Sequence, residues 1–163
     1  MLDEQITAHL FWVWKEGDGF LKHGKECMLV ITDRRMASIT KTDMTPRMHE
    51  THSLRQAKRF EAGENVLRPA EGYKIEHLER DLDKSPDNLE IMFSQILDIE
   101  SVEKDWGTML KVKVNMGDKS KTHKFSIVKG WVKYPAKDPM GFQKLDWSPI
   151  INLVNRTMGS NHQ

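Results

Sequence analysis

Apolar and polar residues alternate over several short stretches near the start of the chain, which predicts β-strands. His9–Lys15 is apolar on both faces, so it is either a strand covered on two sides or a helical turn. Two further strands are expected at Glu26–Ile31 and Met36–Thr40. The charged segment Thr32–Arg35 lies between them and is typical of a tight turn.

From Thr42 to Asn88 the pattern changes to sparse apolar residues at helical spacing. Thr45-Pro46 predicts a helix start, because threonine is a good N-cap and proline suits the first helical turn. Gly63 is expected to end that helix. A second helix is predicted over Glu71–Asp83, stopped before Pro86. We therefore interpret 42–88 as a helical insertion between strands.

Strand patterns return in Ile91–Val128, and an amphipathic helix follows near the end. Apolar residues spaced by three, starting at Ile96, indicate an irregular or bulged strand before the clean alternation of Met109–Val114. Trp147–Met158 carries the helical pattern, with Ser148 as the expected N-cap and Pro149 as the first helical residue. The last residues, 159–163, are polar and predict a flexible tail.

Composition narrows the class of protein. The 163 residues suit a single domain, 1–163, and the 25 basic side chains nearly cancel the 24 acidic ones. No global field therefore draws the chain to nucleic acid, and we expect no nucleic-acid partner. Cys27 is the single cysteine, which excludes an intramolecular disulfide. The acidic N-terminus lacks a signal-peptide pattern and no segment is long and apolar enough to span a membrane, so a cytoplasmic location is expected.

Three motifs in order resemble the GRAM and bacterial pleckstrin-homology-like (PH-like) domains. They are LVITDRRMASI, then ILDIESVEKDWGTMLKVKV, then THKFSI followed by a helix that opens near a tryptophan. The resemblance implies a mainly β fold, α+β by content: a strongly bent antiparallel barrel of about seven strands, closed by a C-terminal helix. The insertion at 42–88 departs from compact members of the family.

The same resemblance implies a site for an anionic headgroup around the first hairpin loop. Clustered cationic donors suit phosphate because several charge-assisted hydrogen bonds converge on one group. Glu16, Asp18 and Glu26 are interleaved with them and weaken their field. The candidate residues are Lys15, Lys22, His23, Lys25, Arg34 and Arg35.

The inserted histidines raise a metal hypothesis. His49 and His52 are three residues apart and can share one helical face, with His77 as a further candidate ligand. The spacing is not that of an HExxH motif, and surface histidines of a polar helix are the simpler interpretation. No nucleophile elbow, glycine-rich phosphate loop or paired-carboxylate motif is present, so we expect no enzyme.

The resemblance thus implies a non-catalytic binding module, which we expect to engage a protein partner, with no cofactor and with the oligomeric state left open. A binder of anionic lipid or phosphoinositide headgroups, acting through the first hairpin loop, is the first alternative. A small metal-assisted enzyme that uses the inserted histidines is the second.

Overall fold

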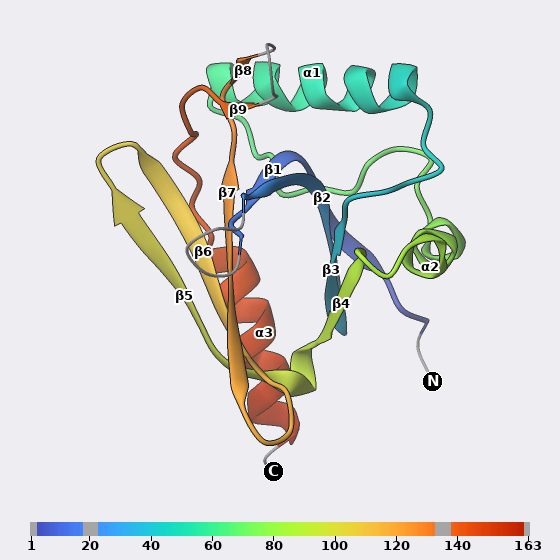
Figure 1. The fold of residues 1–163 in the computed structure, drawn as a ribbon, viewed down its shortest axis with the longest axis vertical. Coiled ribbons are helices and arrows are strands. Elements are labelled where there is room, and N and C mark those ends of the chain that lie inside the picture. The colour runs from blue at the N-terminus through green and yellow to red at the C-terminus, as the bar shows by residue number, and fades with distance from the viewer. Residues whose placement is uncertain (1–2, 18–22, 133–137, 162–163) are drawn as a thin grey trace. The chain divides into compact units, whose positions relative to one another are not determined.

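A computed structural model describes residues 3–17, 23–132 and 138–161. The protein is of mixed α+β class, with seven strands in one antiparallel sheet and three α-helices (Figure 1). In chain order the elements are β1 (Ile6–Lys15), β2 (Lys25–Thr32), β3 (Arg35–Ile39), α1 (Pro46–Ala62), α2 (Ile75–Lys84), β4 (Leu89–Met92), the 3₁₀ turn η1 (Phe93–Gln95), β5 (Ile96–Lys104), β6 (Gly107–Asn115), β7 (Ser120–Ile127), β8 (Trp131–Val132), β9 (Asp138–Pro139) and α3 (Ser148–Asn161).

The sheet is open, so the predicted closed barrel is wrong. Its strand order is β4-β3-β2-β1-β7-β6-β5, and in the described part of the chain no pairing joins β4 to β5. Counting strands from a hydrophobic pattern does not decide whether the two end strands pair. Here β4 has only four residues, and the nine-residue β5 carries a bulge, both of which are common features of sheet edges.

The chain divides into two units, and the boundaries between them fall within β1, within β2 and within β4. Unit 1 comprises Met1–Trp12 and Cys27–Glu90, and unit 2 comprises Val13–Glu26 and Ile91–Gln163. Trp12, the last residue of β1 in unit 1, has a φ of 55°, a left-handed conformation that is rare for a bulky side chain. The residues after it, Val13–Lys15, pair with β7 in unit 2.

Unit 1 combines the β2–β3 hairpin with the helical insertion. The Thr45 side chain accepts a hydrogen bond from Met48 N, and Pro46 is the first residue of α1, as predicted. Gly63 ends α1 with a φ of 69°, in the left-handed region that glycine adopts without a Cβ clash. The core of this unit is formed by Phe11, Met28, Val30, Ala37, Ile39 and Leu78, the last contributed by α2.

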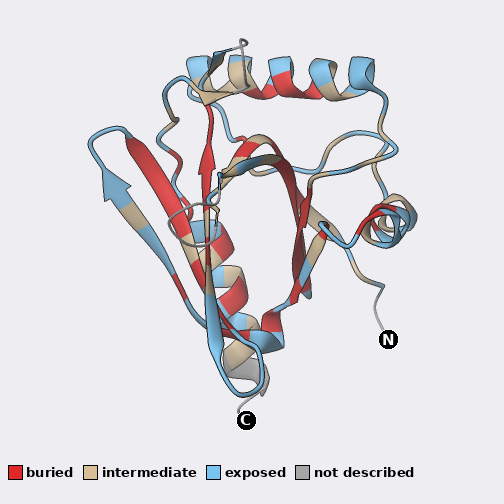
Figure 2. Ribbon diagram, viewed as in Figure 1, coloured by how far each residue is buried: buried red, intermediate tan, exposed pale blue. Residues whose placement is uncertain are grey.

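Unit 2 combines β5, β6 and β7 with α3. The register of β5 against β6 shifts between Ile96 and Asp98, which confirms the predicted bulge. The helix α3 packs against η1 and β5, and Trp147, directly before it, is fully buried. Figure 2 shows buried residues along one side of α3, in keeping with its amphipathic sequence.

The start of α3 differs by one residue from the prediction. The helix begins at Ser148 itself, and the backbone N–H of Ser148 donates to Asp146 Oδ1 at 3.0 Å. Ser148 is therefore the first helical residue rather than the cap. The helix continues to Asn161, into the segment 159–163 that the sequence predicts as a tail.

Candidate functional site

The basic residues predicted around the first hairpin loop belong partly to unit 2. Lys15 is half-buried at the end of β1, and Lys25 is exposed at the start of β2. His23 is exposed, and its Nε2 lies 2.8 Å from Asp138 Oδ1. Lys22 lies outside the described residues. The one histidine of this set is thus held by a carboxylate.

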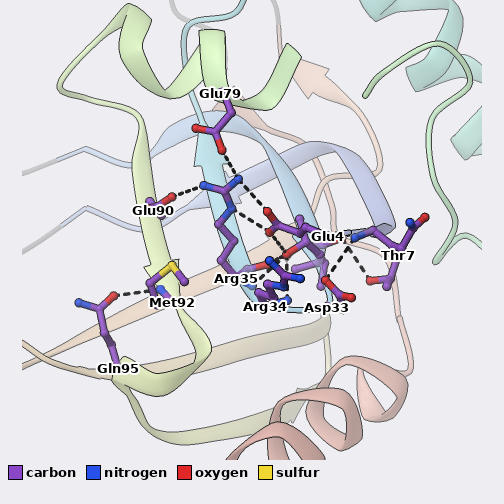
Figure 3. A network of polar contacts seen from close by, with 12 residues as sticks. Glu4, Thr7, Asp33, Arg34, Arg35, Glu79, Glu90, Met92 and Gln95 are labelled. Atoms are coloured by element: carbon purple, nitrogen blue, oxygen red, sulfur yellow. Dashed lines mark hydrogen bonds and ion pairs between the residues drawn. The ribbon is translucent and has the colours of Figure 1, made fainter. Parts of the chain in front are cut away.

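The two predicted arginines belong to unit 1, where β2 turns into β3. Arg34 is exposed, whereas Arg35 is buried and donates to three carboxylates (Figure 3). Its Nε and Nη2 bind the two oxygens of Glu4 at 2.9 and 3.0 Å, its Nη2 also binds Glu79, and its Nη1 binds Glu90. Arg35 therefore joins the N-terminal segment, α2 and β4, and its charge is already overcompensated.

The pKa of Arg35 follows from these contacts. Burial works against the charged guanidinium, but the hydrogen bonds to Glu79, Glu90 and Glu4 outweigh it and raise the pKa above its ordinary value. A guanidinium held in this way stabilises the fold and is poorly placed to receive a phosphate.

The inserted histidines pack against an aromatic ring of β1. In the described ranges, no group of three His, Cys, Asp or Glu side chains is arranged to hold a metal ion. The ring of His52 instead stacks on Phe11, with the centroids 5.2 Å apart, and His49 meets the same ring edge-on at 5.4 Å. His9 stacks on Phe11 as well, at 4.4 Å.

His9 is the residue of this cluster that sequence analysis missed. It is buried, and its Nε2 lies 3.4 Å from Met28 Sδ. Burial, and then the neighbouring His52 and His49, lower its pKa to about 3, so the ring is neutral at physiological pH. The only sequence signal was a polar residue at the head of an otherwise apolar strand.

A pocket of about 300 Å³ lies in unit 1, and we refer to it as the α1–α2 pocket. Its walls come from α1, from the segment before α1, and from α2 with the residues that precede it. The lining is Thr42, Asp43, Met44, Thr45, Met48, His52, Glu71, Gly72, Tyr73, His77, Arg80 and Asp81. His52 and His77, two of the histidines that the metal hypothesis named, are thus brought to one cavity.

Asp81 gives this pocket its shape. The buried carboxylate accepts hydrogen bonds from Thr42 Oγ1 at 2.8 Å, from Asp43 N at 3.0 Å and from Tyr73 Oη at 2.7 Å. Burial, reinforced by Asp81, raises the pKa of Tyr73, which keeps its hydroxyl protonated as the donor. Asp81 therefore holds the segment before α1 and the segment before α2 at their places on the pocket wall.

Comparison with known proteins does not assign the chain to a family. No family model, no curated protein and no solved structure matches this chain. Among the described helices, none is both long and apolar enough to span a membrane.

Proposed function

We propose that the protein is a non-catalytic, PH-like binding module that takes a segment of a protein partner into the α1–α2 pocket. The resemblance implied about seven antiparallel strands followed by a C-terminal helix, and these elements support the class. The pocket belongs to the insertion that departs from compact members of that family. The insertion therefore supplies the binding surface in this proposal.

The observation that carries the proposal is the lining of the α1–α2 pocket. Met44, Met48 and Tyr73 give it apolar and aromatic walls, and methionine adapts well to varied partners. A volume of about 300 Å³ is at the small end of the range for ligand sites and suits one anchoring side chain of a peptide. Met48 is 47% exposed, which leaves apolar surface of α1 accessible at the pocket.

The charges around the pocket favour a peptide over an anionic headgroup. Asp43, Glu71 and Asp81 contribute three carboxylates, against the guanidinium of Arg80 and the ammonium of Lys84, which is ion-paired with Asp43. Such a lining repels a phosphate and accepts an apolar side chain flanked by neutral or basic residues. In the hairpin region, Arg35 is surrounded by Glu4, Glu79 and Glu90, which weakens the lipid alternative.

A peptide library displayed on phage and panned on the purified chain tests the proposal. Peptides with an apolar anchor should be enriched, and Met48→Glu should lose their binding because a carboxylate enters an already acidic pocket. Leu54→Glu is the matched control, since Leu54 is also on α1, is 48% exposed and does not line the pocket.

Two results would contradict the proposal. One is peptide binding that survives Met48→Glu or is lost equally in Leu54→Glu. The other is micromolar binding of short-chain phosphoinositides that disappears in Lys25→Glu, which would support the headgroup alternative instead.

A further inference from the structure

A second cavity in unit 1, of about 90 Å³, lies along the C-terminal half of α1, and we refer to it as the arginine pocket. Gln56 forms part of its wall and fastens α1 to β1. The Gln56 side chain accepts from Phe11 N and donates to Phe11 O, both at 2.8 Å. The wall that carries the pocket is therefore rigidly tied to the strand.

Three arginines line this small space; Arg55 and Arg68 are exposed to solvent and Arg59 is half-buried. Arg55 and Arg59 are one helical turn apart on α1, and Arg68 comes from the segment between α1 and α2. The carbonyl of Arg68 accepts from His9 N at 3.0 Å, which holds that segment against β1. Within the described part of the chain, none of the three guanidiniums has an ion pair or a side-chain hydrogen bond.

The charge of the lining is strongly positive for its size. Glu71 is the one carboxylate that lines the pocket, so three guanidiniums and one carboxylate leave a net charge of +2 when the histidines are neutral. His52, which also lines the pocket, reports this field: burial lowers its pKa, and the charges of Arg55 and Arg59 lower it further. A bound dianion would balance the excess.

A buried polar atom also lacks a partner at this site. His9 lines the arginine pocket, and its Nδ1 is buried without a hydrogen bond to any described residue. The Met28 thioether, next to Nε2, can only accept a hydrogen bond. The proton of the neutral ring therefore belongs on Nε2, and Nδ1 presents a lone pair that needs a donor.

We propose that the arginine pocket binds a phosphate group. Guanidinium groups bind phosphate oxygens through paired, charge-assisted hydrogen bonds, and the net charge of +2 on the lining matches the charge of about −1.5 to −2 on a phosphate monoester. A cavity of about 90 Å³ has room for a phosphate group. The source is either free phosphate or a phosphorylated side chain.

NMR titration of the full ¹⁵N-labelled chain tests this site, with sodium chloride at equal ionic strength as the reference. Inorganic phosphate should shift the amides of residues 52–71 and the ring of His9 in a saturable way. Arg55→Gln and Arg59→Gln should each weaken binding roughly tenfold or more, since each removes charged hydrogen bonds. Arg47→Gln is the control, because Arg47 is exposed on α1 and lines neither pocket.

The same titration with phosphoserine identifies the source. Tighter binding of phosphoserine than of inorganic phosphate indicates a phosphorylated side chain, and the reverse order indicates the free ion. Shifts that do not saturate, or that are equally reduced in Arg47→Gln, would overturn the proposal as non-specific screening. Because Met48 does not line the arginine pocket, phosphate binding should survive Met48→Glu, so this site and the partner site can fail separately.

Discussion

The two units bury different kinds of side chain. Among the described residues, only Thr108, His123 and Ser126 are buried polar residues of unit 2, whereas unit 1 contains the other ten, including the charged Arg35 and Asp81. The interior of unit 2 is built from large apolar groups, which include Trp147, Phe93, Phe125, Ile150 and Val154. The helix of unit 2 is therefore fastened by apolar packing, and the helices of unit 1 depend on polar ties as well.

Asn88 shows what a polar tie achieves in unit 1. Its side chain accepts from Thr40 N, Thr40 Oγ1 and Lys41 N, and donates to the carbonyls of Lys41 and Asp81. One amide thus joins the end of β3 to the end of α2. A buried polar network in which every hydrogen bond is made favours one arrangement of the elements. Removing one member leaves its partners without hydrogen bonds and lowers stability strongly. Both pockets belong to the unit built in this way.

The largest effect on stability is expected in unit 2. Trp147 is fully buried next to α3, so Trp147→Ala should reduce the free energy of unfolding by about 3–5 kcal/mol. Denaturant unfolding measures the loss. Trp106→Ala is the control, because Trp106 is 44% exposed in the same unit and its truncation should cost far less. Equal losses for the two tryptophans would show that α3 does not depend on Trp147.

A smaller loss should follow from breaking the ion cluster of unit 1. Arg35→Met removes the cation shared by Glu4, Glu79 and Glu90. The side chains of Glu79 and Glu90 are 56% and 40% exposed and can turn to water, which limits the loss to roughly 2–3 kcal/mol. Arg34→Met, at an exposed neighbouring position, is the control.

A double mutant separates charge from packing in this cluster. Glu4 is the most buried of the three acids, so adding Glu4→Gln to Arg35→Met should restore part of the lost stability. No recovery in the double mutant would mean that Arg35 acts mainly by filling space, as the apolar residues of unit 2 do.

The third effect depends on pH. The pKa of His9 is about 3 in the folded chain and about 6.5 when unfolded, so the unfolded state binds more protons between these values. The contribution of neutral His9 to the free energy of unfolding is therefore fully present above pH 6.5. It falls as the pH drops, by about 2 kcal/mol at pH 5. The difference between the free energies of unfolding at pH 7 and at pH 5 should be smaller in His9→Phe than in the unchanged protein. In His23→Phe, which alters an exposed histidine of unit 2, the difference should persist.

Local features of the fold could be predicted because their causes are local. The Thr45-Pro46 start of α1, its end at Gly63 and the bulge after Ile96 each depend on a few consecutive residues. Closure of the sheet depends on whether two distant end strands meet, and no local pattern encodes that. The barrel was therefore predicted from resemblance and was wrong, while the strand number and the C-terminal helix were right.

The candidate site was harder to predict, because its residues come from distant segments. Arg35 was identified as a cation, but its partners Glu4, Glu79 and Glu90 lie 31, 44 and 55 residues away. His52 and His77 were identified as histidines that could act together, and they do line one pocket. His9 was passed over, since a single polar residue in an apolar strand has no distinctive spacing.

The smallest effect on stability is expected at the helix starts, where α1 of unit 1 can be compared with α3 of unit 2. Thr45 Oγ1 accepts from Met48 N at 3.2 Å, so Thr45→Ala should lower the free energy of unfolding by about 1 kcal/mol. Ser148→Ala should cost clearly less, because the Ser148 hydroxyl bonds the exposed Asp146 and not a helix N–H, and the backbone N–H of residue 148 still donates to Asp146 in the variant. Thermal or denaturant unfolding of both variants distinguishes them. An equal loss in Ser148→Ala would show that the hydroxyl of Ser148 caps α3, as the hydroxyl of Thr45 caps α1.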